Sequence, residues 1–173
     1  MDDWRTQIAI ADLGKRRIAE LDIDEMWPYC TPEVAATPSE IDHAELLIGE
    51  ELDEKFRAFL SSANGWKAFF HSVDLFGTHE LSAGPDWQVA TELLESLSPL
   101  ESLCGLVAAD LLPIAVSRHS IDLFVISRRH TQKPGEVFWF AGQLIERFAD
   151  FDQFFLAMVE YNRETVKAFE AEQ

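Results

Sequence analysis

The sequence predicts an α+β fold, with a mainly antiparallel central sheet, N-terminal helices and a C-terminal helix packed on the sheet. Three observations predict it. Apolar residues recur at helical spacing through residues 1–63, short apolar runs bounded by turn residues fill much of 66–148, and a long amphipathic pattern occupies 150–170. The chain has 173 residues, 47% of them hydrophobic, which suits one domain with a substantial core.

Three helices are expected before the sheet, at residues 2–21, 39–48 and 53–63. The first has an apolar face made by Trp4, Ile8, Ala11 and Ile18. Residues 22–38 hold three prolines and little periodicity, so they predict a connector. Ser39 is the expected N-cap of the second helix, Gly49 ends it, and Asn64-Gly65 is expected to stop the third.

The sheet is expected to contain short strands joined by turns. The expected strands are 66–70, 73–76, 111–117, 121–127, 137–140 and 144–148, with a helix at 87–97 between the second and the third. Apolar residues on both faces of 121–126 indicate a central strand. The last helix should dock on the sheet through Phe151, Phe154, Phe155, Met158 and Asn162.

Net charge is the main signal in the composition. The chain has 31 acids and 14 bases, a formal charge of −17. Residues 1–60 hold 15 acids against 6 bases, and residues 61–110 hold 7 acids against 1 base. Such a field repels nucleic acid and anionic lipid and attracts a basic protein. Plain solubility is the alternative explanation, and the sequence leaves both open.

The sequence offers no constellation for catalysis, and we expect no catalytic residue, metal or cofactor. His71, Asp74, His79 and Glu80 lie close in sequence, but their spacing fits exposed loop residues better than a zinc site. Glycine-rich phosphate loops and nucleophile motifs are absent from the sequence. The N-terminus lacks the features of a secretory signal and Cys30 and Cys104 are far apart, so we expect a cytoplasmic protein with reduced thiols.

Several small motifs in order carry a family resemblance. They are Ile41, Glu45, Gly49, Leu52, Phe56, Phe59, Leu60, Asn64, Gly65 and Trp66, followed by 73–76, 112–115 and 151–155. This pattern resembles the SUKH superfamily, the Smi/Knr-like group, over roughly residues 37–160. The family's Leu-Pro is Leu52-Asp53 here, and a Gly-Asp in its hairpin is replaced by residues 119–122. The expected division is 1–36 as helix and connector and 37–170 as the SUKH-like domain.

The resemblance implies a mixed α+β domain that binds proteins. Bacterial members look like immunity proteins that bind a cognate toxin and block it, and fungal relatives are regulatory scaffolds. We therefore expect a non-enzymatic protein-binding domain, with an immunity protein for a basic toxin as the leading hypothesis. A regulatory scaffold without a toxin partner is the alternative, and a small-molecule enzyme is a third hypothesis. The sequence leaves monomer and homodimer open, and predicts neither a nucleic-acid nor a membrane partner.

Nine residues are the predicted partner-binding set. The steering or ion-pairing acids are Glu50, Glu51, Asp53, Glu54, Asp74, Glu80 and Asp86, and the apolar anchors are Trp66 and Trp87. Asn64-Gly65-Trp66 also has a simpler explanation, in which Asn-Gly stops a helix and Trp66 packs in the core or lines a cleft. The acids at 50–54 are expected to be solvated, as a charged face first and a partner-binding rim second.

Overall fold

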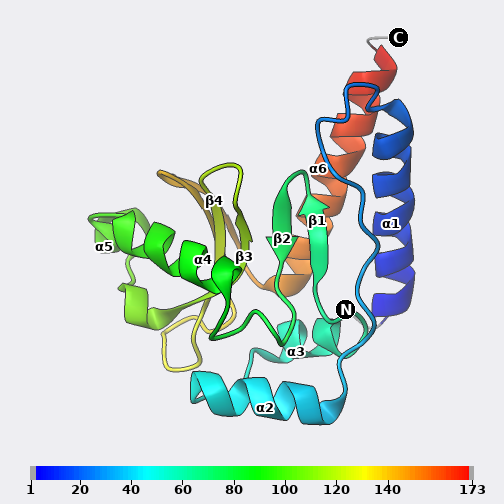
Figure 1. Cartoon of the computed structure of the whole chain (residues 1–173). Coiled ribbons are helices and arrows are strands. Elements are labelled where there is room, and N and C mark those ends of the chain that lie inside the picture. The colour runs from blue at the N-terminus through cyan, green and yellow to red at the C-terminus, as the bar shows by residue number, and fades with distance from the viewer. Residues whose placement is uncertain (1–2, 172–173) are drawn as a thin grey trace.

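The computed structural model describes residues 3–171 and confirms the predicted α+β class (Figure 1). A six-stranded antiparallel sheet follows the chain in the order β1-β2-β3-β4-β5-β6. The helices are α1 (Trp4–Leu21), α2 (Pro38–Ile48), α3 (Glu54–Leu60), α4 (Pro85–Ser96), α5 (Leu100–Cys104) and α6 (Phe151–Ala171). The strands are β1 (Trp66–Phe70), β2 (Val73–Leu75), β3 (Leu111–Ser117), β4 (Asp122–Ser127), β5 (Val137–Ala141) and β6 (Leu144–Phe148). Within residues 3–171, no helix has the length and apolar content required to cross a bilayer.

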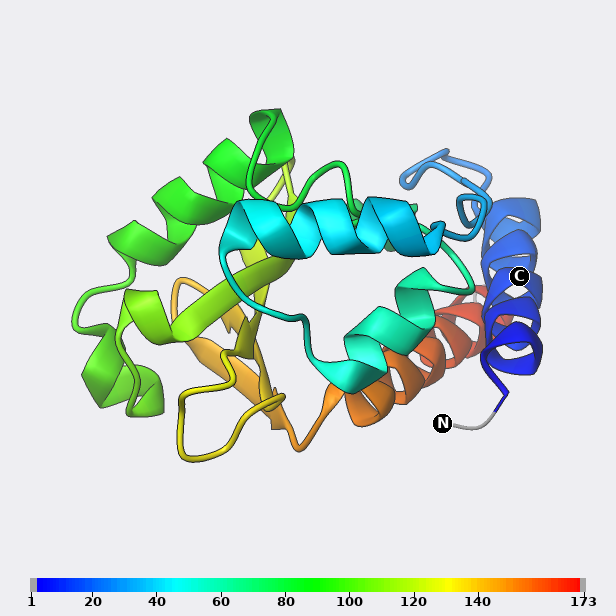
Figure 2. The same ribbon diagram turned by 90° about the horizontal axis from the view of Figure 1, so that it is seen from below.

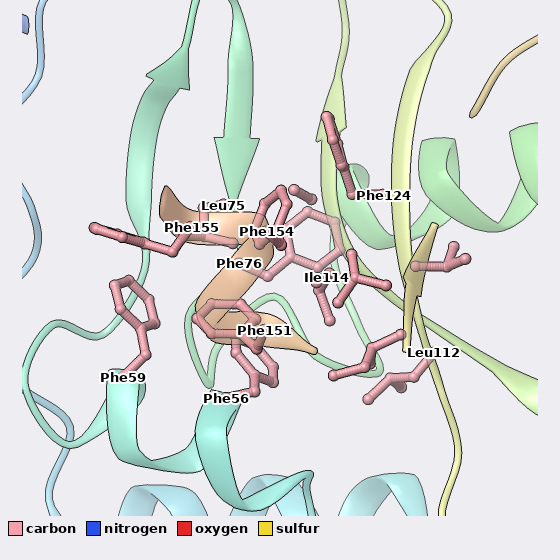
Figure 3. Close-up of a cluster of buried hydrophobic side chains, with 14 of the residues drawn as sticks. Phe56, Phe59, Leu75, Phe76, Leu112, Ile114, Phe124, Phe151, Phe154 and Phe155 are labelled. Atoms are coloured by element: carbon pink, nitrogen blue, oxygen red, sulfur yellow. The ribbon is translucent and has the colours of Figure 1, made fainter. Parts of the chain in front are cut away.

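Both faces of the central strands are covered, which is why β3 and β4 are apolar on both sides. On one face Phe124 of β4 packs against Phe154 of α6, with ring centroids 5.1 Å apart. On the other face α4 packs on β3 and β4. The predicted docking face of α6 is confirmed, since Phe151, Phe154, Phe155, Met158 and Asn162 are all buried. Figure 3 shows the aromatic cluster that α6 forms with α3 and the sheet.

Helix α1 lies alongside α6 and contributes to the same core (Figure 1). Its predicted apolar face is confirmed, and Lys15 and Leu21 are buried on it too. Trp4 meets Phe59 and Phe155 edge-on, with ring centroids 5.4 and 5.0 Å apart. The N-terminal helix is thereby joined to α3 and α6 through aromatic packing.

The predicted N-cap of α2 is wrong by two residues. Thr37 is the N-cap, Pro38 follows it, and Glu40 completes a capping box by accepting from the Thr37 N–H at 2.7 Å. Gly49 ends the helix in the left-handed region at φ +78°, as predicted. Only Ile41 and Ala44 of α2 are fully buried, so most of this helix faces solvent.

Helix α3 ends at Leu60, before the predicted stop at Asn64-Gly65. Asn64 instead joins the start of β1 to the segment after β2: Thr78 N–H donates to Asn64 Oδ1 at 2.7 Å, and Asn64 Nδ2 donates to Thr78 Oγ1 at 3.0 Å. Gly65 and Gly77 allow this contact, because a Cβ on Gly77 would lie 2.1 Å from the Asn64 carbonyl oxygen. Helix α5 was not predicted.

Candidate protein-binding groove

Four of the predicted partner-binding acids lie in one place. Glu50, Glu51 and Asp53 follow α2, Glu54 begins α3, and all four line an open groove of about 510 Å³. Seen from below, the loop that leaves α2 forms one side of this region and the loop between β4 and β5 lies on another (Figure 2). The remaining lining residues are Leu52, Lys55, Leu112, Ile126, Ser127, Arg128, Arg129, Pro134, Gly135, Ala149 and Asp150.

Two of the groove acids form ion pairs with arginines that are distant in the sequence. Glu50 pairs with Arg128, and Glu51 pairs with Arg129, across 78 residues of sequence. The pair of Glu51 and Arg129 is the more open, with side-chain exposures of 71% and 47%. Glu51 is therefore solvated as expected, although Arg129 pairs with it, whereas Glu50 is only 22% exposed because Arg128 from the β4–β5 loop covers it.

Asp53 has a structural role. Its Oδ1 accepts from the N–H groups of Lys55 and Phe56 at 3.0 and 3.1 Å, which caps α3. Its Oδ2 lies so close to Gly135 that a Cβ there would stand 2.5 Å away. Lys55 in turn pairs with Asp150 at 2.7 Å. Five carboxylate side chains and three basic side chains line the groove, so its net charge is negative.

The other three predicted acids form a separate cluster around Lys67. Asp74, Glu80 and Asp86 lie 3.6, 3.1 and 2.9 Å from its Nζ, and Asp86 also accepts from Arg118. Burial raises the pKa of Asp86, but hydrogen bonds from Arg118 and Lys67 outweigh it and lower the pKa overall. Because the Asp86 side chain is only 5% exposed, it joins α4 to β1 and the β3–β4 turn rather than facing a partner.

Of the two predicted aromatic anchors, Trp66 belongs to the core and Trp87 packs against it. Trp66 is 0% exposed, and its Nε1 donates to the Cys30 carbonyl at 2.7 Å. Trp87 is partly buried and packs against the hydrophobic core. Trp66 therefore cannot present its side chain to a partner, and neither tryptophan lines the groove.

Two exposed leucines beside the groove were not among the binding residues predicted from the sequence. Leu46 is 76% exposed and Leu47 is 55% exposed, both near the C-terminal end of α2. The signal was available, since the face formed by Ile41, Ala44 and Ile48 leaves residues 46 and 47 pointing elsewhere. An apolar pair on the solvent side of an amphipathic helix calls for an explanation.

A second hollow contains the residues that most resemble a catalytic site, but the environment of its cysteine disfavours catalysis. Cys104, Asp110 and His130 line a hollow of about 440 Å³, and His130 Nε2 lies 2.9 Å from Asp110 Oδ1. The Cys104 thiol, however, donates to the carbonyls of Leu100 and Leu106, and burial raises its pKa. A nucleophilic cysteine needs the thiolate, which this environment disfavours. Within residues 3–171, no His, Cys, Asp or Glu cluster of three or more is suited to hold a metal.

Lys15 is a buried charge at the junction of α1, the connector and the β1–β2 turn. It is 2% exposed, and burial lowers its pKa to about 8, which attraction to Cys30 only partly opposes. Burial and the Lys15 charge likewise lower the pKa of His71 to about 4, and the His71 ring stacks on Trp27 with centroids 4.0 Å apart. At neutral pH, Lys15 is thus charged, and no carboxylate within residues 3–171 pairs with it.

We expect Lys15→Met to stabilise the protein by about 1–3 kcal/mol near neutral pH, because it removes a buried charge and keeps the apolar stem. The pKa of Lys15 is about 8 in the folded state, against the ordinary lysine pKa of 10.5 that applies in the unfolded chain. The unfolded state therefore holds this proton more tightly, and wild-type stability should rise as pH increases through that interval. The advantage of Lys15→Met should shrink over the same interval.

Urea denaturation at neutral and alkaline pH measures both effects. Lys167→Met is the matched control, since the Lys167 side chain is 64% exposed and should change stability little at either pH. A Lys15→Met protein less stable than wild type at neutral pH would show that the ammonium is stabilising where it lies.

Comparison with known proteins agrees with the resemblance carried by the motifs. The model of the SMI1/KNR4 family (SUKH-1) matches residues 35–157, a segment that includes α2, the groove and the whole sheet. No curated protein matches the chain. Because the family model covers well over half of the sequence, this chain belongs to the SMI1/KNR4 family (SUKH-1).

Proposed function

We propose that this chain is a non-enzymatic immunity protein that acts in the cytoplasm, where it binds a basic toxin and blocks it. The groove lined by Glu50, Glu51, Asp53 and Glu54 is the proposed contact surface. The observation that carries the proposal is the gathering of these acids in one groove with an excess of negative charge. Membership of the SUKH-1 family supports a protein partner.

The charges of the groove suit exchange with a partner. An exposed ion pair such as Glu51 with Arg129 contributes about 0–1 kcal/mol, so a partner's lysine or arginine can replace the arginine at little cost. Glu54 is exposed at the start of α3 and adds to the field at the groove mouth. Complementary charge raises the rate of encounter and discriminates against acidic partners. Asp53 and Asp86 stabilise the fold, so we assign them no contribution to the binding energy.

Co-expression with the neighbouring reading frame tests the function directly. The neighbouring product should arrest growth when expressed alone, and this chain should restore growth and co-purify with that product. A neighbouring product that is harmless, or that is toxic but neither rescued nor bound, would contradict the immunity role. Binding without toxicity would favour a regulatory scaffold.

We expect Glu51→Lys/Glu54→Lys to slow association with that partner by about tenfold and to weaken the salt dependence of binding, with a smaller effect on dissociation. The physical reason is the lost attraction at the groove mouth. Stopped-flow or biolayer kinetics over a salt series measure the rates. Glu92→Lys/Glu95→Lys is the matched control, because both acids are exposed on α4 and lie outside the groove. Equal slowing by both variants would show that only net charge matters and that the groove is not the contact.

A further inference from the structure

The solvent face of α2 combines apolar and acidic residues in one stripe. Residues 42, 43, 46 and 47 share this face by helical spacing. Asp42, Leu46 and Leu47 are exposed on it, and Glu50 follows at the groove. Two leucines flanked by charged residues have the composition of an interface, with an apolar centre and a polar rim.

The surroundings of the leucines are strongly negative. Residues 39–54 contain seven carboxylates and no lysine or arginine. Three arginines from elsewhere pair with four of them: Arg57 with Asp42 and Glu45, Arg128 with Glu50, and Arg129 with Glu51. The carboxylates around this helix thus outnumber the bases that pair with them. A basic surface is the complement of that excess.

We propose that Leu46 and Leu47 are the apolar anchor of the toxin-binding surface, inserting into an apolar hollow on a basic protein whose lysines and arginines contact the adjacent groove. This rests on the proposed function and assigns to these leucines the role that the tryptophans were expected to play. It also continues the groove surface onto α2, since Glu50 and Glu51 come three and four residues after Leu47 in the chain.

A second copy of this chain is the less suitable occupant. Two identical α2 faces related by a twofold axis would bring the same carboxylates together, and like charges at close range cost free energy. Each copy also carries a net charge of −17, which opposes the encounter at low salt. A basic partner meets neither obstacle.

Binding of wild type and Leu46→Ala/Leu47→Ala to the purified product of the neighbouring reading frame tests the inference. The double variant should bind roughly 10- to 100-fold more weakly, mainly through faster dissociation, and keep the wild-type salt dependence. Leu13→Ala is the matched control, since Leu13 is 64% exposed on α1, away from the groove, and this variant should bind as wild type does. Alanine favours the helix, so both variants should keep the wild-type melting temperature.

The outcomes distinguish failure of the leucine anchor from failure of the immunity function. Wild-type affinity in the double variant would overturn the anchor role while leaving the immunity function intact. No binding by wild type itself would overturn the proposed function and, with it, the anchor. Sedimentation gives the remaining result: a wild-type dimer that Leu46→Ala/Leu47→Ala dissociates would identify a second copy as the occupant and overturn the basic partner.

Discussion

Replacing Gly77 with alanine is expected to destabilise the folded state by about 3–5 kcal/mol. The added Cβ would stand 2.1 Å from the carbonyl oxygen of Asn64, far inside any tolerated contact. The obstacle is backbone, so a side-chain rotation cannot relieve it. The β1 entry and the segment after β2 would have to separate, which would also stretch the two hydrogen bonds between Asn64 and Thr78.

Urea or thermal denaturation measures this effect, and Gly14→Ala gives a matched control with the opposite sign. Gly14 lies within α1 with no atom within 4 Å of its Cβ position. Alanine there should stabilise the protein by about 0.5–1 kcal/mol, because it favours the helix. Unfolding of Gly77→Ala at the same denaturant concentration as wild type would contradict the close contact between Gly77 and the Asn64 carbonyl.

The Asn64-Gly65 pair shows what sequence periodicity captures and what it misses. Helical spacing placed the start of α3 to within one residue, and Gly49 marked the end of α2. The local pattern also suggested that Asn64-Gly65 stops α3, yet α3 ends at Leu60. Both residues instead serve a contact with Gly77 and Thr78, and Thr78 lies 14 positions after Asn64. Local propensity cannot report a contact that only the folded sheet creates.

The candidate site shows the same limit. The acids at 50–54 were identified from charge alone, and the structure gathers them in one groove. Their partners Arg128 and Arg129 come from the β4–β5 loop, so no local rule links them to Glu50 and Glu51. Tryptophan is enriched in interfaces and in cores alike, and composition could not distinguish these for Trp66. The structure distinguishes them, because Trp66 is 0% exposed and belongs to the core.

Trp4→Ala is expected to destabilise the protein by about 3–5 kcal/mol, because it removes a large side chain from an aromatic cluster. Trp4 is 6% exposed, and its ring lies 5.0–5.8 Å from those of Phe59, Phe151 and Phe155. Its Nε1 is buried without a hydrogen-bond partner in the described part of the chain, so the indole contributes packing rather than a polar contact. Trp4→Phe should therefore cost far less, since it keeps a ring in place and removes that buried N–H.

The form of the unfolding curve then tests how α1 relates to the rest of the fold. The sequence suggested a division after residue 36, and the SUKH-1 match begins at residue 35. Because Trp4 packs on α3 and α6, we expect Trp4→Ala to keep a single transition and shift all of it to lower denaturant. Far-ultraviolet circular dichroism and tryptophan fluorescence should report the same midpoint. Two transitions, with the sheet unaffected by the substitution, would instead mean that α1 is an appended element and that residues 37–170 fold without it.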